Sequence, residues 1–450
     1  MKKKLSFLLA SVMACSALLA GCSGGASSAA APSGSAAAGA ASSAASGETV
    51  TLRYLSYDHQ LDNVLQAFED SHPGIKVEVE IQTENNSTEF LKKLDLLQLS
   101  GDTYDVTCLP SYGQYASRAS KGFWEQLDGY FAAQNTDPGE YYSIDTAVDG
   151  AYYGIPGTPG IYYVIFNKDL LDAAGLEVPA MDWTWDDYAE YAAALTSGTG
   201  TDTVYGSHMH TWTEYRRENL WCVKDDNCYV REPGVSNLDD PAFGEWLSFI
   251  KGLEDDGYQM SYADAKATNV AYRDVFFQGK AAMMLTGSWM VNDILNTENF
   301  PHDFKTAFAP FPRWKDSDPG RCEGDSGIYV VNSNSEHKDA AFELISYLGS
   351  EEAAAVTLNP SCVRGADNTA VLEKKVSGHE DLFDMASMIR IWNDTNLTPV
   401  STRSHLTTFT QVDEIYNAET ELYMLDSQDL ETTLKNIQEK AGPIIEAMED

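Results

Sequence analysis

Residues 49 to 82 read TVTLRYLSYDHQLDNVLQAFEDSHPGIKVEVEIQ, and this stretch decides the fold class. Its first eight residues are largely β-branched, aromatic or apolar, which is typical of a strand. The segment LDNVLQAFEDSH then places apolar side chains on one helical face, at Leu61, Val64, Leu65 and Phe68. The next segment alternates as a strand does, at Ile75, Val77, Val79 and Ile81. The stretch therefore predicts a strand–helix–strand unit.

The same order of elements continues along the chain. STEFLKKLDLLQLSG, residues 87–101, predicts a helix that stops at Gly101, and YDVTCL, residues 104–109, predicts a third strand. Strands that alternate with helices indicate a parallel α/β sheet. A second series of different lengths follows: strand 160–167, helix 168–175, a helix from the capping box Thr184–Asp187, strand 326–332, helix 337–350 and a helical tail over 429–448. We therefore expect an α/β fold with two α/β units.

The first 21 residues have the pattern of a signal peptide. Three lysines, residues 2–4, precede the apolar run Leu5–Leu19, which is too short for a lasting transmembrane helix. The run ends in Leu-Ala-Gly-Cys, residues 19–22, which resembles the lipobox of bacterial lipoproteins. Cys22 would then be lipidated and become the new N-terminus. The alternative is an ordinary signal peptide followed by a chance cysteine.

Residues 22–48 are expected to form a lipidated cysteine followed by a tether. Residues 23–47 contain only Ser, Gly, Ala and Pro, so they bury too little apolar area to fold. A random coil of this length spans about 25–30 Å. The protein would then be lipid-anchored and would act on the extracytoplasmic face of the bacterial cell membrane.

The remaining body, from Glu48 to Asp450, is long enough for two large domains. The net charge of the chain is −38, and removal of the signal peptide, with its three lysines, makes it more negative. This charge argues against a nucleic-acid partner and against polybasic contact with anionic lipid.

Cysteines and histidines give little sign of a structural or catalytic metal site. The body contains five cysteines, an odd number, at positions 108, 222, 228, 322 and 362. Cys222 and Cys228 could close a short disulfide loop, and the spacing leaves this open. No CxxC pair occurs, and HMH at residues 208–210 alone is weak evidence for a metal. We expect neither a metal nor a cofactor.

Five segments carry a family resemblance: AFEDSHPGIKVEVE (67–80), LSGDTYDVTCL (99–109), DGAYYGIPGTPGIYYVIFNKDLLDAAGLEVPAMDWTWDDYAEYAAAL (149–195), FQGKAAMMLTGSWM (277–290) and GIYVVNSNSEHKDAAFELISYLGSEE (327–352). In this order they resemble the extracellular solute-binding proteins of ABC transporters, in the carbohydrate-uptake group that includes maltose-binding protein. Tyr104 stands where a proline is usual. The resemblance extends over essentially the whole chain after the tether.

The resemblance implies a periplasmic-binding-protein-like type II fold, with two α/β lobes joined by hinge strands and a ligand cleft between them. By position, lobe 1 would cover residues 49–158 and 324–364, and lobe 2 residues 159–323 and 365–450. The chain would cross between the lobes near residues 157–161, 323–329 and 363–367.

The implied function is binding of a sugar or oligosaccharide outside the membrane and its delivery to the permease subunits of an ABC importer, by a monomer without catalytic activity. Three alternatives stay open: a non-sugar solute such as a peptide or polyamine, a surface sensor or adhesin, and, less favoured, a carbohydrate-active enzyme. With 68 acidic residues, a carboxylate pair fit for glycoside cleavage can always be found and carries no weight. GxSxG, HExxH, Walker and GxGxxG elements in their required contexts are absent from the sequence.

Trp289 is the leading candidate for ligand contact. The apolar run Ala281–Leu285 stops at Thr286-Gly287-Ser288, and Ser288 is a plausible N-cap for a helix with Trp289 at its first position. A helix that starts at the carboxyl end of a strand in an open α/β sheet lies at the ligand cleft. The resemblance independently puts a sugar-stacking tryptophan here. The alternative is a core tryptophan between sheet and helix.

Eight further residues are candidate ligand contacts: Asp58, Glu84, Asn85, Tyr112, Tyr163, Trp212, Asp325 and Arg364. The first four follow the first three strands, whose carboxyl ends would meet at the cleft. Trp212 falls where the resemblance places aromatic residues of the second lobe, and strand alternation lets only one of Tyr162 and Tyr163 face the cleft. The last two lie beside predicted crossings. Each has a structural alternative: helix cap, solvated loop, packing or interlobe ion pair. Asp105, Trp183 and Trp185 are expected to be structural.

Overall fold

The computed structural model describes residues 49–57, 61–83, 86–217, 229–232, 234–314, 321–393, 398–400 and 407–447. The predicted signal peptide and tether lie outside these ranges. So do Cys22, Asp58, Glu84, Asn85 and the Cys222–Cys228 pair.

The first three strands form a parallel sheet, as the sequence predicts. β1 (Val50–Ser56) pairs in parallel with both β2 (Ile75–Ile81) and β3 (Val106–Leu109). α1 (Asp62–Ser71) and α2 (Ser87–Ser100) connect them. Gly101 ends α2 with a left-handed φ of 77°, a conformation that glycine adopts without steric cost.

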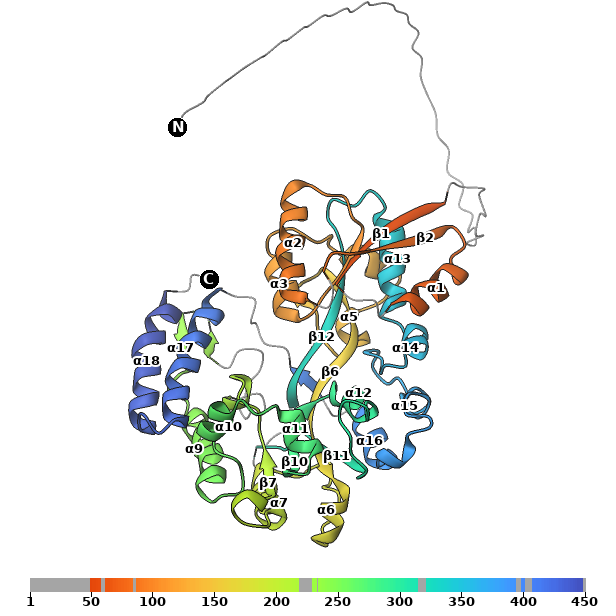
Figure 1. The fold of residues 1–450 in the computed structure, drawn as a ribbon. Coiled ribbons are helices and arrows are strands. Elements are labelled where there is room, and N and C mark those ends of the chain that lie inside the picture. The colour runs from red at the N-terminus through yellow and green to blue at the C-terminus, as the bar shows by residue number, and fades with distance from the viewer. Residues whose placement is uncertain are drawn as a thin grey trace, which may run out of the picture. The chain divides into compact units, whose positions relative to one another are not determined.

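Two long strands join this sheet to the rest of the chain (Figure 1). β6 (Gly154–Asn167) pairs antiparallel with β12 (Arg321–Val331), and β12 pairs with β3. The second half of β6 pairs with β10 (Ala281–Gly287) and β11 (Thr306–Pro310). The strand order is β2-β1-β3-β12-β6-β10-β7, where β7 is Tyr205–His208.

The buried apolar residues form two main cores, and each core defines a lobe. The core of lobe 1 includes Leu52, Phe68, Val106, Ile155 and Ile345. The core of lobe 2 includes Ile161, Phe166, Trp246, Met283 and Phe308. β6 passes from one core to the other between Ile155 and Ile161. The predicted two-lobed α/β architecture is confirmed.

The remaining elements belong to one lobe or the other, in part through two smaller apolar clusters, one with Phe90 and Tyr115 in lobe 1 and one with Tyr416 and Ile437 in lobe 2. Lobe 1 also holds α3 (Tyr112–Ala119), α4 (Asp128–Ala133), α5 (Pro138–Tyr141), β4 (Ala147–Val148), β5 (Ala151–Tyr152), α13 (Lys338–Leu348) and α14 (Glu351–Thr357). Lobe 2 also holds α6 (Lys168–Ala173), α7 (Trp185–Leu195), β8 (Val230–Glu232), β9 (Val235–Ser236), α9 (Pro241–Asp255), α10 (Tyr262–Thr268), α11 (Tyr272–Phe277), α12 (Met290–Leu295), α15 (Thr369–Lys375), α16 (Met385–Trp392), α17 (Thr407–Met424) and α18 (Leu430–Glu446). β13 (Thr398–Val400) pairs with β12. No helix in the described ranges is both long and apolar enough to cross a membrane.

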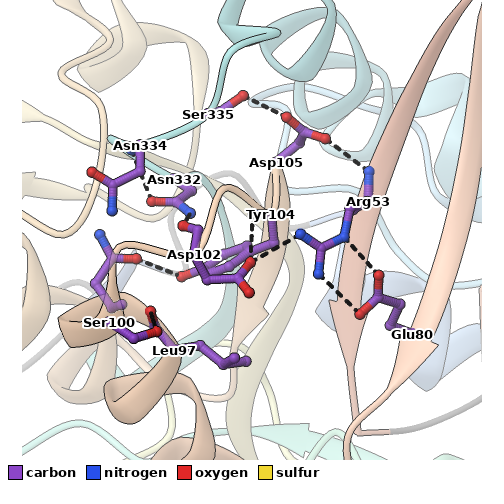
Figure 2. A network of polar contacts seen from close by, with 11 residues as sticks. Arg53, Glu80, Leu97, Ser100, Asp102, Tyr104, Asp105, Asn332, Asn334 and Ser335 are labelled. Carbon is purple, nitrogen blue, oxygen red and sulfur yellow. Dashed lines mark hydrogen bonds and ion pairs between the residues drawn. The ribbon is translucent and has the colours of Figure 1, made fainter. Parts of the chain in front are cut away.

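Asp105 is structural, as predicted. One carboxylate oxygen accepts from the Arg53 backbone N–H at 2.8 Å, and the other accepts from the Ser335 hydroxyl (Figure 2). The Arg53 guanidinium in turn pairs with Glu80 at 2.7 Å and with Asp102 at 2.9 Å. Asp105 is 2% exposed, so this network satisfies a carboxylate that would be costly to bury alone.

The helix entry at Thr184 also agrees with the sequence. The Thr184 hydroxyl accepts from the Asp187 backbone N–H, and the Asp187 carboxylate accepts from that of Thr184, which completes a capping box. Trp183 and Trp185 are 4% and 1% exposed and pack in the core of lobe 2. Both predictions are confirmed.

A buried acid in lobe 2 predicts a pH-dependent stability. Burial raises the pKa of Glu254, whose side chain is 3% exposed, to about 7, and Lys251 at 3.6 Å offsets only part of that effect. Because the folded state keeps a proton that the unfolded state loses above pH ~4.5, stability falls as pH rises from about 4.5 to about 7. Glu254→Gln should match wild type at pH 5 and gain up to about 3 kcal/mol over it at pH 8, as measured by urea unfolding.

Asp255→Asn provides the control, since the Asp255 side chain is 67% exposed and lies on the same helix. Its stability difference from wild type should stay within about 0.5 kcal/mol at both pH values. Parallel pH profiles for wild type and Glu254→Gln would show that Glu254 is not the titrating group.

Candidate binding site

The first two predicted crossings, residues 157–161 and 323–329, pair directly with each other as strands. Gly324, Asp325 and Ser326 of β12 face Ile161, Gly160 and Pro159 of β6, and the register shifts between Ser326 and Ile328. The Gly157 backbone N–H donates to the Ser326 hydroxyl at 3.0 Å across this irregularity. The chain thus passes from lobe to lobe along two paired strands, whose pairing register is interrupted at one point.

A cavity of about 420 Å³ lies against these strands. Its lining joins Pro110, which follows β3 of lobe 1, to α12, α15 and α16 of lobe 2. The lining residues are Pro110, Thr158, Pro159, Gly160, Tyr162, Ser288, Trp289, Val291, Asn292, Ser326, Gly327, Asn359, Pro360, Leu372, Lys375 and Trp392. A volume in this range suits a small organic ligand of sugar size.

A second cavity of about 330 Å³ adjoins the first. The two share the lining residues Thr158, Asn292, Gly327, Asn359, Pro360 and Lys375. The second reaches into lobe 1, where Ser56 and Tyr57 mark the carboxyl end of β1 and Cys108 lies in β3. That location matches the rule that open α/β sheets bind ligands beyond the carboxyl ends of their strands.

Trp289 forms part of the wall of the first cavity. β10 ends at Gly287 and α12 begins at Met290, so Trp289 occupies the N-cap position, and no side chain caps this helix. The expectation that Ser288 caps the helix is therefore wrong by one position. The indole is half-buried and folds back over Gly287: a Cβ built there would lie 2.0 Å from the nearest indole carbon. Glycine at 287 thus leaves the space that the indole fills.

An aromatic cluster continues from Trp289. The Tyr162 ring meets it edge-on at 5.5 Å, and the Trp212 ring lies at 6.1 Å. Trp212 packs on His210 at 3.9 Å, while 42% of its own surface stays exposed. It borders a separate shallow pocket with Thr211, Thr213 and Tyr262. The structure therefore brings Trp212 close to Trp289, but only Trp289 lines the first cavity.

Tyr162, and not Tyr163, lines the cavity. Tyr163 is 0% exposed and packs edge-on to Phe308 at 5.5 Å in the core of lobe 2, where burial raises its pKa well above the usual value. Successive side chains of a strand point to opposite faces, so Tyr162 faces the cavity that Tyr163 cannot reach. The prediction that Tyr163 contacts the ligand is therefore wrong, and Tyr162 takes its place as the candidate.

The geometry above is that of a two-lobed protein with an aromatic-walled cavity at its hinge. Residues 57–355 match the family model described as bacterial extracellular solute-binding protein. The chain belongs to this family. The family is defined by solute binding rather than by catalysis.

Three similar proteins illustrate the relation. A Brucella abortus (strain 2308) binding protein, whose name gives no ligand, is 24% identical over 351 residues, which cover 75% of this chain and 79% of that one. An arabinooligosaccharide-binding protein of Halalkalibacterium halodurans is 26% identical over 216 residues, 46% of each chain. The structure of a sugar transporter from Rhizobium etli, in an open conformation, has a TM-score of 0.76 at 22% identity and covers 89% of this chain and 100% of that one.

Two other candidates lie away from the first cavity of this solute-binding protein. Tyr112 is 6% exposed, and its hydroxyl donates to the Ala147 carbonyl at 2.6 Å. It therefore packs within lobe 1, and the prediction that it contacts the ligand is wrong. Arg364 is exposed and lines a different cavity of about 390 Å³, which shares Pro159 and Trp392 with the first.

The segment predicted as a third crossing, residues 363–367, lies between α14 and α15 in the chain. The Arg364 N–H donates to the Tyr141 carbonyl at 2.8 Å, and this segment leads from α14 of lobe 1 to α15 of lobe 2. Asp325 pairs with Gly160 through the backbone, and its side chain lies outside what the structure describes.

The cavity also contains residues that the sequence did not single out. Trp392 is 9% exposed and lines the first cavity, and its buried indole N–H donates to no acceptor among the described residues. Asn292, Asn359 and Lys375 supply polar groups. Lys375 lies three residues after the buried Leu372, and this helical spacing indicates that both side chains lie on the same face of the helix.

Proposed function

We propose that this protein binds a sugar or oligosaccharide outside the cytoplasmic membrane and delivers it to the permease subunits of an ABC importer. The observation that carries the proposal is the cavity at the hinge with Trp289, Tyr162 and Trp392 in its wall. The names of two similar proteins, an arabinooligosaccharide-binding protein and a sugar transporter, support a sugar as the ligand.

The cavity offers both kinds of contact that a sugar needs. Aromatic faces such as that of Trp289 provide large, rigid area for the C–H faces of a pyranose ring. Sugar hydroxyls need hydrogen-bond partners, because a buried unpaired polar group costs about 1–3 kcal/mol. Asn292 and Asn359 each carry a donor and an acceptor.

Transport requires that binding be reversible and that the bound state be recognisable. Because residues of both lobes line the cavity, a sugar that contacts both favours the arrangement in which the lobes are closest. The lobe boundaries proposed for this motion are residues 49–158 with 324–364 and residues 159–323 with 365–450. The protein is proposed to act as a monomer and without catalysis.

A thermal-shift screen of the full chain against a broad panel of glycans tests the proposal. A ligand that binds only the folded state raises the melting temperature by mass action. We expect one class of saccharide to give a saturable shift and to be recovered intact by chromatography. Shifts only with peptides or polyamines would show a non-sugar ligand, and cleaved glycan would show an enzyme.

The anchor makes a separate prediction. We propose that residues 1–21 are a lipoprotein signal peptide, that Cys22 is lipidated, and that residues 22–48 tether the body to the membrane. Cys22→Ser should move the protein from the membrane fraction to the soluble fraction and leave sugar affinity unchanged, since the binding cavity lies far along the chain. Ser23→Ala serves as the control and should stay in the membrane fraction. Membrane retention of Cys22→Ser would contradict the anchor.

A further inference from the structure

The cavity at the hinge differs in charge from the rest of the chain. The sequence has 68 acidic and 30 basic residues. Among the described residues, however, the lining of the two adjoining cavities includes no Asp or Glu, and Lys375 is its only Lys or Arg. These two cavities of an acidic protein thus present a cation and no described carboxylate, whereas the cavity that shares Pro159 and Trp392 with the first adds one charge of each sign, Arg364 and Asp367.

Helix geometry directs Lys375 into the cavity. It is the last residue of α15, three positions after Leu372, which is 1% exposed and lines the same cavity. Residues three apart share a helix face, so Lys375 follows Leu372 toward the cleft. Lys374, one position earlier, is exposed to solvent and lines neither cavity.

The ammonium of Lys375 has one protein partner in the described part of the chain. Its Nζ donates to Asn359 Oδ1 at 3.0 Å. Burial lowers the pKa of Lys375, and no acidic side chain of the described residues counters that effect. An ammonium group has three N–H donors, so the contact with Asn359 leaves capacity for further acceptors.

The fold alone gives little reason for a lysine in this place. A cation near the C-terminus of a helix interacts favourably with the helix dipole, but Lys374 supplies the same charge in the same turn from solvent. An ammonium that is half-buried and has no counterion among the described side chains lowers the stability of the fold rather than raising it. Contact with a bound solute therefore explains a lysine at position 375 better than a role in folding does.

We propose that Lys375 binds an oxyanion of the solute, a carboxylate or a phosphate group, and that the preferred ligand is an acidic sugar. This inference rests on the proposed function. The oxyanion would accept charge-assisted hydrogen bonds from Lys375 Nζ. Asn292 and Asn359, which line both cavities, would contact neighbouring hydroxyls.

Matched ligands and matched variants test the inference by calorimetry on the full chain in mild detergent. The ligands are trigalacturonate and its methyl ester, and galactose 1-phosphate with galactose. Each pair differs chiefly in the anion. The variants are Lys375→Gln and Lys374→Gln. We expect wild type to prefer an acidic member over its neutral partner, and Lys375→Gln to bind that acidic ligand about tenfold to a hundredfold more weakly.

Lys374→Gln should bind as wild type does, and the melting temperature of unliganded Lys375→Gln should stay the same or rise. Whichever acidic class binds identifies the oxyanion. A neutral saccharide as the tightest ligand, or an acidic ligand that binds Lys375→Gln undiminished, would overturn the inference while the proposed function stands. Failure of every acidic and neutral carbohydrate in these assays and in the glycan panel would overturn the proposed function, and this inference with it.

Discussion

Trp289→Ala is expected to weaken sugar binding by about 2–3 kcal/mol, which is about thirtyfold to over a hundredfold in Kd. The indole forms part of the cavity wall, and its edge contact with Tyr162 at 5.5 Å helps to hold it in place. Large aromatic side chains in a binding wall contribute apolar area at little entropic cost. Calorimetric titration of wild type and variant with the same saccharide measures the loss.

The melting temperature of the unliganded variant should fall little, because Trp289 is half-buried and lies at the edge of the core of lobe 2. Sugar should change the tryptophan fluorescence of wild type, and the variant should lose much of that change. A large loss of stability with undiminished affinity would show instead that Trp289 is a core residue.

Gly287→Ala is expected to weaken binding about tenfold or more without removing any side chain. A Cβ at residue 287 would lie 2.0, 2.5 and 2.6 Å from three carbons of the Trp289 indole. Carbon atoms require about 3.5–4.0 Å, so the indole must leave its position in the wall. The variant tests the orientation of Trp289, whereas Trp289→Ala tests its presence.

Gly252→Ala is the matched control, since a Cβ there meets nothing within 4 Å. Gly252 lies inside α9, so alanine should stabilise the protein by about 0.5–1 kcal/mol and leave affinity unchanged. Wild-type affinity in Gly287→Ala would mean that the orientation of the indole is irrelevant to binding.

Local patterns predict the fold well where strands and helices are amphipathic. The alternation from Ile75 to Ile81 and the helix that stops at Gly101 both appear as expected. The long β6 was predicted only over residues 160–167. Its first half contains Pro156, Gly157 and Pro159, which weaken any strand pattern. Pairing with β12 holds that half in the sheet, and such long-range pairing leaves no local signal.

The site was predictable only in part, for a related reason. The position of Trp289 follows from the strand-to-helix turn, but the choice between Tyr162 and Tyr163 depends on which face of β6 the core occupies. Trp392 and Lys375 come from helices that follow the third crossing. Helical spacing puts Lys375 on the same face as Leu372, but whether that face lines the cavity depends on how lobe 2 folds back toward the hinge, which periodicity does not encode.

The most direct test of sugar binding at the hinge is a crystal structure of the protein with the saccharide that gives the largest thermal shift. We expect a sugar ring against the indole of Trp289, in the cavity bounded by β6, β12 and α12, with its hydroxyls bonded to residues such as Asn292 and Asn359. A saccharide bound elsewhere, with this cavity empty at saturating concentration, would contradict it.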